Sequence, residues 1–436
     1  MKPTNRTGII DLQSRSGAEW SLSGMPAAEP VTEPVPEKER IVSIDVLRGF
    51  ALLGILPMNI QYFSMISAAY MNPTMYGDLH GANLWIWVLS HVLADEKFMA
   101  IFSMLFGAGI LLMTSRIEAA GMRSAPLHYR RMAWLTLFGL AHAYLLWSGD
   151  ILYSYGMCGL LVYPLRKLRP ATLIVAGLLL MAIVPALLTA VAHLPPRELQ
   201  SLREQMWQPT PVDTARELAT FRGGWRKQMG TRMGDSLGVE IVYFPVWTVW
   251  RVCGVMLVGM ALFKLGVLSA ACRPRVYWWM IAAALLGGIP AILYEVHCNL
   301  AVGWDFVQAF LYNSQLNYWA SLAVALGWVG ATMLAPKWAA PAAVGRMALT
   351  NYIMQTVICT TIFYGHGLGL FGKVERTGQF AIVIAVWALE LVWSPIWLAR
   401  FRFGPLEWLW RSLTYWKLEP MRSTTDSISS SAPVKK

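Results

Sequence analysis

The sequence predicts an all-α membrane protein of about ten transmembrane helices. The first observation is composition: 56% of the 436 residues are hydrophobic and 14% are charged, whereas soluble domains carry about 25% charged residues. The second is that several apolar runs approach the roughly 20 residues that cross a bilayer. The third is that Lys and Arg gather in short clusters between these runs, as in cytoplasmic loops of membrane proteins.

These observations favour the lipid bilayer as the partner of the chain. The net charge is +11, but no nucleic-acid-binding pattern accompanies it, so nucleic acid is not an expected partner. The five cysteines form no CxxC pair, and no metal site is expected. Whether two copies associate as a homodimer stays open.

Two polar tails flank one predicted transmembrane domain, residues 41–417. Residues 1–40 include the Pro/Glu-rich stretch AAEPVTEPVPEKER and are predicted to be a disordered cytoplasmic tail. Residues 418–436 are predicted to be a second disordered tail. The apolar runs predict ten spans, at about 46–67, 97–115, 132–149, 151–165, 171–193, 244–263, 276–296, 313–335, 347–365 and 379–399.

The distribution of basic residues predicts the orientation. The connection from Arg116 to Arg131 contains four arginines, whereas segments 68–96 and 297–312 contain no Lys or Arg. The positive-inside rule then places both termini in the cytoplasm. Residues 194–243 carry seven Lys and Arg, roughly balanced by acids, and form the one predicted outer loop long enough to cap a site.

Two further segments are predicted to lie at the membrane surface. Residues 81–95, GANLWIWVLSHVLAD, are too short to span and are predicted to form an interfacial or re-entrant helix on the outer side. Residues 400–417 are aromatic and basic and follow the last span. They are predicted to form an interfacial helix on the cytoplasmic face, and a membrane anchor is favoured there over a ligand site.

Polar groups within the cytoplasmic halves of the spans must face the bundle interior or water, because each costs a few kcal/mol in lipid. Asp45 and Arg48 stand three residues apart on one helical face and are expected to pair, either as a snorkelling pair or in a functional role. Arg346, Asn351 and Gln355 recur at helical spacing and either join helices or line a cavity. The deep Glu390 needs a partner, for which Arg346 and Arg48 are the first expectations.

The outer side holds the candidate catalytic groups. His91 and Asp95 stand at i, i+4, and a histidine beside a carboxylate can act as a general base. His142 is the second candidate, with Asp150 as the residue that would orient it, because the connection between these two spans is very tight. His80, in a predicted loop, is third. A lone helical histidine is more often a satisfied core residue than a catalyst.

Five motifs in order resemble the YeiB family of bacterial inner-membrane proteins over most of residues 40–417: DVLRGFALLGIL, KFMAIFSMLFGAG, GLAHAYLLWSGDIL, GRMALTNYIMQ and FRFGPLEWLWRSLTY. This resemblance implies a multi-pass protein of the bacterial inner (plasma) membrane. SIDVLRGFALLGILPMN also resembles the first span of heparan-α-glucosaminide N-acetyltransferase, with Asp45, Arg48 and Asn59 at matching spacing. In that transmembrane acyltransferase group, cytosolic acyl-CoA enters the bundle and an outer histidine helps transfer the acyl group to a sugar.

The resemblance implies a transmembrane acyltransferase with acyl-CoA or acetyl-CoA as co-substrate. The acceptor would be a hydroxyl or amine of a small or glycan-like molecule on the outer side. The expected co-substrate-binding residues are Asp45, Arg48, Asn59, Arg346, Asn351 and Gln355, and the expected catalytic residues are His91, Asp95, His142 and Asp150. The sequence departs from the group at residues 60–70, where no histidine follows Asn59.

Two other functions stay open. A transporter for a small solute could use the buried charges Asp45, Arg251 and Glu390 as a pathway, although no inverted repeat is visible. A non-enzymatic membrane component that binds a partner is the third reading of the sequence.

Overall fold

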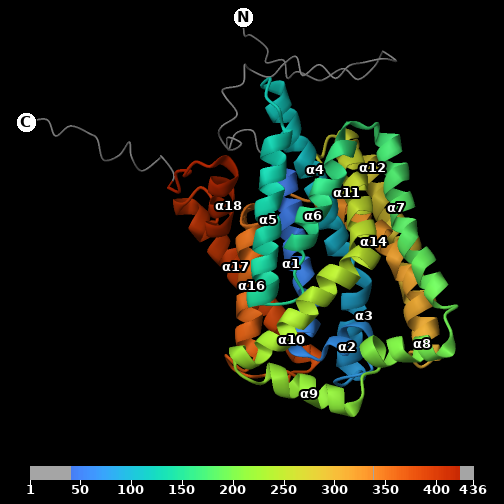
Figure 1. Ribbon diagram of the computed structural model, residues 1–436. Helices are drawn as coiled ribbons and strands as arrows, with labels where there is room; N and C mark the ends of the chain where they lie inside the picture. Colours follow the sequence, from blue (N-terminus) through green and yellow to red (C-terminus); the bar gives the residue numbers. More distant parts are fainter. Residues whose placement is uncertain (1–40, 337, 423–436) are drawn as a thin grey trace, which may run out of the picture.

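A computed structural model describes residues 41–336 and 338–422 as a bundle of helices (Figure 1). The predicted tail 1–40 and residues 423–436 of the second tail lie outside the described residues. No β-strand occurs within the described part of the chain, so the all-α prediction is confirmed.

Each of the ten predicted spans corresponds to a helix or to consecutive helical segments: α1 (Val42–Ser64), α4 (Lys97–Ala119), α5 (Ala125–Leu145), α6 (Leu152–Val162), α7 (Pro170–Val191), η4 with α11 (Val239–Thr248, Val249–Lys264), α12, η5 and α13 (Pro274–Ala283, Ala284–Gly288, Ile289–Ala301), α14 (Ser314–Leu334), α16 (Ala348–Phe363) and α17 (Arg376–Arg400). Among residues 41–336 and 338–422, six stretches are both long and apolar enough to cross a membrane, and α16 is a shorter apolar helix. The chain is therefore a polytopic membrane protein.

Burial separates central helices from peripheral ones. In α1, 78% of the most apolar window is buried inside the protein, and the α4 and α11 stretches are also mostly buried. In α7, α17 and the α12–α13 stretch the buried share is 22%. Because an all-round apolar helix that is poorly buried by protein must face lipid, α1, α4 and α11 form the core and the other three lie at the lipid-facing rim.

The bundle has two distinct ends. The basic end consists of the connections 120–124, 163–169 and 265–273 together with α18 (Pro405–Tyr415) (Figure 1). Its basic residues include Arg123, Arg166, Lys167, Arg169, Arg273 and Arg411. The capped end consists of α2 (Ser67–Met71) and residues 194–243. These names are kept below.

The capped end is covered by a set of short helices where the sequence predicted a long loop. They are α8 (Pro196–Leu202), η3 (Arg203–Trp207), α9 (Pro211–Phe221) and α10 (Trp225–Gly238). Glu217 of α9 accepts a hydrogen bond of 2.7 Å from the Ser67 backbone, and burial raises the pKa of that carboxyl. Ser236 of α10 donates to the Ala143 carbonyl at 3.1 Å. The cap is thus bonded to α2 and to the end of α5.

The predicted interfacial or re-entrant segment is α3 (Gly81–Leu93), which leads directly into α4. Together they form an apolar stretch of 39 residues, Gly81–Ala119. The two helices are separated by a break in which Glu96 has the left-handed backbone φ of 63°. The Leu93 carbonyl, left without a helical partner by this break, accepts a hydrogen bond of 3.0 Å from Trp328 Nε1. α3 therefore lies against the bundle as the first half of a broken helix.

Small residues set the closest helix contacts. A Cβ on Gly49 of α1 would lie 1.9 Å from the backbone carbonyl oxygen of Pro341. A Cβ on Gly345 would lie 2.0 Å from the backbone carbonyl oxygen of Asp45. Both contacts join α1 to α15 (Ala339–Arg346). Gly107 and Gly259 make a similar approach between α4 and α11. Close backbone packing of this kind drives helix association where no hydrophobic effect operates.

We expect Gly49→Ala to destabilise the protein by about 1–3 kcal/mol, because the added methyl group overpacks the α1–α15 contact. Gly109→Ala on α4 is the matched control, since a Cβ at that position meets nothing within 4 Å. It should be neutral or stabilise by up to about 1 kcal/mol through helix propensity. Thermal unfolding in detergent measures both, and equal midpoints for the two variants would contradict the packing argument.

Candidate functional site

The most completely assembled polar group is a row formed by Asp150, His142 and Thr356. His142 Nδ1 lies 2.7 Å from Asp150 Oδ1, and the two side chains are 1% and 2% exposed. His142 Nε2 lies 3.0 Å from Thr356 Oγ1, on α16. The contact between His142 and Asp150 that the tight connection predicted is present.

Local structure explains how Asp150 reaches His142. α5 ends at Leu145, and α6 begins at Leu152 after a connection of six residues. Gly139 lets the two helices approach, because a Cβ there would lie 2.1 Å from the Tyr153 nitrogen and 2.7 Å from Asp150 Oδ2. Asp150 Oδ2 accepts a hydrogen bond of 2.7 Å from that same backbone nitrogen. The carboxylate is therefore fixed both to the start of α6 and to the histidine.

The row has the chemistry of a general base beside a hydroxyl. An ionised carboxylate only accepts hydrogen bonds, so His142 Nδ1 donates to Asp150. The lone pair of Nε2 then faces the Thr356 hydroxyl, and the Tyr352 ring packs 5.2 Å from the imidazole. A base held by an orienting carboxylate and in contact with a hydroxyl is the arrangement that nucleophile activation requires. The same contacts also join α5, α6 and α16 mechanically.

His91 has different surroundings. Its Nδ1 lies 3.1 Å from Asp95 Oδ2, as the i, i+4 spacing predicted, and its Nε2 lies 3.3 Å from Glu295 Oε2 on α13. The Trp87 ring stacks on the imidazole at 5.1 Å. Since both ring nitrogens face carboxylates, neither is placed to take a proton from a substrate. The third histidine, His80, has a side chain that is 94% exposed and pairs only with Asp78.

A second buried charge group lies at the break between α3 and α4. Arg251 Nη2 on α11 lies 2.9 Å from Glu96 Oε2. Arg251 also donates to the Tyr318 carbonyl at 2.9 Å and to Ser321 Oγ at 2.7 Å. Lys97, fully buried, donates to Asn317 Oδ1 at 2.6 Å. This group ties α4, α11 and α14 together near the break.

The polar stripe of α16 mainly joins that helix to α17. Asn351 Nδ2 donates to Ser394 Oγ at 2.9 Å, and Gln355 Nε2 donates to Glu390 Oε2 at 3.1 Å. The expectation that Arg346 or Arg48 would pair with Glu390 is therefore wrong. Glu390 is 1% exposed, and its second oxygen, Oε1, has no hydrogen-bond partner. An amide is the partner because Glu390 faces the middle of α16, whereas Arg346 precedes that helix.

The residues of α1 that were predicted to bind a co-substrate are spread along the helix. Arg48 Nη1 and Asp45 Oδ1 form the predicted ion pair at 3.0 Å, near the basic end. Asn59 is half-buried and stands eleven residues farther on, about 16 Å along the axis at 1.5 Å per residue. Only an elongated ligand could contact both ends of this set.

Sequence reasoning missed a cluster of arginines at the basic end. Arg131 of α5 lies over the Trp410 ring of α18 at 4.4 Å, and Arg411 lies over the Phe403 ring at 4.7 Å. Burial lowers the pKa of the Arg411 guanidinium to about 10, and the nearby charges of Arg131 and Arg48 act in the same direction. Guanidinium groups that crowd in this way favour a shared anion.

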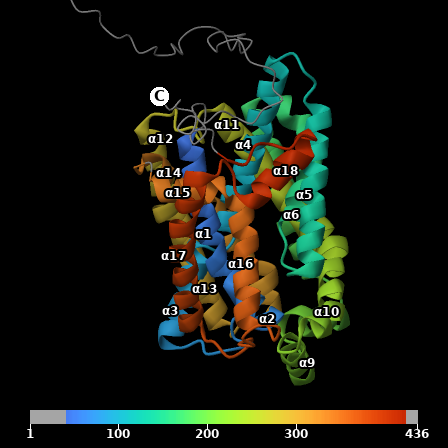
Figure 2. The ribbon, with the colours of Figure 1, turned by 90° about the vertical axis from the view of Figure 1, so that its left-hand side faces the viewer.

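α18 is held against the bundle by hydrogen bonds as well as by the packing of its aromatic rings. Figure 2 shows it crossing the end of α5, where Trp410 Nε1 donates to the Arg131 carbonyl at 3.0 Å. Glu407 accepts from the backbone nitrogens of Leu349 (2.6 Å) and Thr350 (3.1 Å), so it caps α16. The i, i+4 spacing of Glu407 and Arg411 would allow these two side chains to pair, but the Glu407 carboxylate bonds to α16 instead. Burial raises the pKa of the Glu407 carboxyl.

Two cavities show where the bundle is hollow. One, of about 10 Å³, lies between α1, α3 and α17. The other, of about 370 Å³, is an apolar groove between the α12–α13 stretch and α14. Asp45, Arg48, Arg346 and His142 line neither of these two cavities. Within the described residues, no group of three or more His, Cys, Asp or Glu side chains could hold a metal ion.

Comparisons with known proteins show the family of this chain. Residues 262–417 match the family model described as "Protein of unknown function (DUF418)". The chain is 34% identical over 402 residues to "Uncharacterized protein YeiB" of Escherichia coli (strain K12), covering 89% of this chain and 99% of that one. It is also 34% identical over 421 residues to "Uncharacterized protein YxaH" of Bacillus subtilis (strain 168), covering 90% and 98%. The chain therefore belongs to the YeiB family.

Proposed function

We propose that the protein is a transmembrane acyltransferase in which His142, oriented by Asp150, is the general base. The observation that carries this proposal is the buried row in which Asp150 Oδ1 lies 2.7 Å from Nδ1 and Thr356 Oγ1 lies 3.0 Å from Nε2. Among the predicted histidines, His142 is the one whose second nitrogen faces a hydroxyl. An acceptor hydroxyl in the place of the Thr356 hydroxyl would meet a base already in the correct tautomer.

The reaction would transfer an acyl group from acyl-CoA to the acceptor. His142 Nε2 takes the proton of the acceptor hydroxyl as its oxygen attacks the thioester carbon. The carbon–sulfur bond breaks, the new carbon–oxygen bond forms, and the imidazolium returns the proton to the departing CoA thiolate. Asp150 stabilises the positive imidazolium during the step, as the carboxylate of a catalytic triad does.

The proposed orientation places the basic end in the cytoplasm of a bacterial cell, with the protein in the inner membrane and both termini cytoplasmic. Acyl-CoA would then arrive at the end that carries Arg48, Arg131 and Arg411, with Arg346 and Asp45 alongside. Asn59, Asn351 and Gln355 are the amides that a pantetheine arm would pass. The two cavities described above lie elsewhere in the bundle.

The test is a titration of acetyl-CoA on the purified protein. We expect Arg131→Gln and Arg411→Gln each to weaken acetyl-CoA binding about tenfold, since each removes a charge-assisted contact to phosphate. Arg275→Gln, an exposed arginine at the same end outside the cluster, is the matched control and should leave the affinity unchanged. Absence of binding and of thermal stabilisation by acetyl-, propionyl- or succinyl-CoA would count against the acyltransferase.

A permease is the second candidate function. The observation that favours it is the helix break at Glu96 beside the buried Arg251, because interrupted helices with buried charges mark binding sites in transporters. Counterflow in proteoliposomes tests it. Uptake that survives the combined neutralisation of Asp45, Arg251 and Glu390 would rule out a pathway through these charges.

A further inference from the structure

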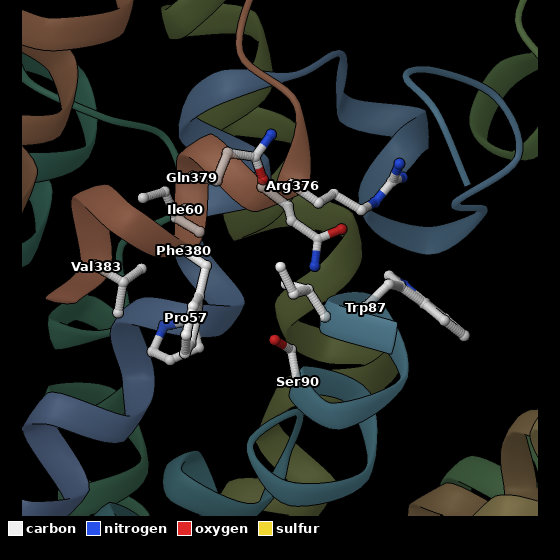
Figure 3. A pocket seen from close by; sticks show the side chains of 10 residues that line it. Pro57, Ile60, Trp87, Ser90, Arg376, Gln379, Phe380 and Val383 are labelled. Atoms are coloured by element: carbon white, nitrogen blue, oxygen red, sulfur yellow. The ribbon is translucent and has the colours of Figure 1, made fainter. Parts of the chain in front are cut away.

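The residues that line the small cavity between α1, α3 and α17 include three with a buried polar atom that has no hydrogen-bond partner. Its volume is about 10 Å³, close to the least that holds one water molecule or one hydroxyl group, roughly 10–15 Å³. Figure 3 shows Arg376, Gln379 and Ser90 around the space, together with the rings of Trp87 and Phe380. Buried polar groups are almost always hydrogen-bonded, so this lining requires an explanation.

Gln379 presents a carbonyl oxygen to the cavity. The side chain is 1% exposed, and its Nε2 donates to the Val374 carbonyl at 3.0 Å. That bond fixes which end of the amide is nitrogen, because a carbonyl can accept only from the NH₂ group. The oxygen, Oε1, is buried and has no partner. Gln61 Oε1 on α1 is a second buried oxygen without a partner that belongs to the same lining.

Arg376 presents a single donor. Its terminal nitrogens are occupied by backbone carbonyls, Nη1 by Asp78 at 2.8 Å and Nη2 by Pro73 at 2.9 Å. The side chain is 1% exposed, and its Nε–H has no partner. The cavity thus offers two carbonyl acceptors and one N–H donor, with the Ser90 hydroxyl available as either.

We propose that this cavity binds one hydroxyl group of a neutral, polyhydroxylated ligand of the sugar or polyol class. A hydroxyl group can donate to an amide oxygen and accept from Arg376 Nε–H. An anion would meet the two carbonyl oxygens, and a cation would meet the guanidinium, so both charge classes fit the lining worse. The volume admits only the hydroxyl, and the remainder of the ligand lies outside, where Phe380 reaches the surface of the bundle.

The site stands without the acyl-transfer proposal, because His142 and the arginines of the basic end take no part in it. The bound hydroxyl group could belong to a free sugar or to the headgroup of a neutral glycolipid. A glycolipid fits the apolar surface around the cavity. Trp85, Leu89 and Ile384 are exposed apolar side chains on α3 and α17, next in sequence to residues of the lining.

The experiment uses the full-length protein in phosphatidylcholine nanodiscs and measures thermal unfolding and equilibrium binding. One arm adds radiolabelled methyl β-glucoside, a second replaces part of the lipid with monoglucosyl diacylglycerol, and a third adds inorganic phosphate. We expect the first or second arm to raise the unfolding midpoint of the wild type. Stabilisation by the glucoside alone assigns a free sugar, and by the glycolipid alone a headgroup.

Gln379→Met and Gln61→Met test the lining, and Gln308→Met, at an exposed glutamine, is the matched control. Each lining variant should weaken binding about tenfold through one lost hydrogen bond, with acetyl-CoA affinity unchanged. Should Gln379→Met fail to fold, Gln61→Met, at a half-buried position, decides. The proposal is overturned if neither glucoside source stabilises the protein, if phosphate does so equally, or if folded lining variants bind like the control.

Discussion

His142→Gln is expected to lower the rate of acyl transfer by about a thousandfold, within the range that removal of a general base produces. The amide cannot take the proton of an acceptor hydroxyl, yet it can still donate to Asp150 and contact Thr356. Folding and acetyl-CoA affinity should therefore be retained. The measurement is release of the CoA thiol from acetyl-CoA by the protein in proteoliposomes, together with the binding titration.

A second variant within the row and a control histidine outside it make the test specific. Asp150→Asn should also lose about a thousandfold or more in rate, because an amide can favour the wrong imidazole tautomer. His128→Gln is the matched control: His128 is fully buried on the same helix, but its Nε2 contacts the Gly159 carbonyl. Full activity of His142→Gln with loss of activity in His91→Gln would move the catalytic assignment to His91.

The sequence predicted the parts of this protein that depend on local pattern. Apolar length predicted the helices of the bundle, because a bilayer imposes a length on each spanning helix separately; within the described residues, six stretches have that length and apolar character. The His91–Asp95 and Asp45–Arg48 pairs were predictable, since spacing alone brings residues at i, i+4 and i, i+3 together. The His142–Asp150 contact could be predicted because the connection between α5 and α6 is short.

The partners across helices could not be predicted, because they depend on how each helix is rotated against its neighbours. Glu390 meets Gln355 instead of an arginine, and Glu407 caps α16 instead of pairing with Arg411. Thr356 joined the His142 row without any sequence signal, since one threonine in an apolar run is common. Whether the row catalyses acyl transfer stays a prediction that the His142 variants test.

Arg251→Met is expected to destabilise the protein by about 3–5 kcal/mol, the usual cost of leaving a buried charge without its partner. Arg251 is 1% exposed and pairs with Glu96 at 2.9 Å. Its removal leaves the Glu96 carboxylate without this ion pair at the break between α3 and α4. The Tyr318 carbonyl and Ser321 Oγ also lose the hydrogen bonds that Arg251 donates to them. Thermal or denaturant-induced unfolding in detergent measures the loss.

A double-mutant cycle separates the ion pair from the other contacts of Arg251. Glu96→Gln alone should cost less than Arg251→Met, and the combined variant should be more stable than the sum of the single losses, because no unpaired charge remains. The control is Arg216→Met, which breaks an ion pair of 3.0 Å whose side chains are 72% and 48% exposed. It should cost no more than about 1 kcal/mol. Strictly additive losses at Glu96 and Arg251 would show that their charges do not stabilise each other, and the helix break would then owe its geometry to packing alone.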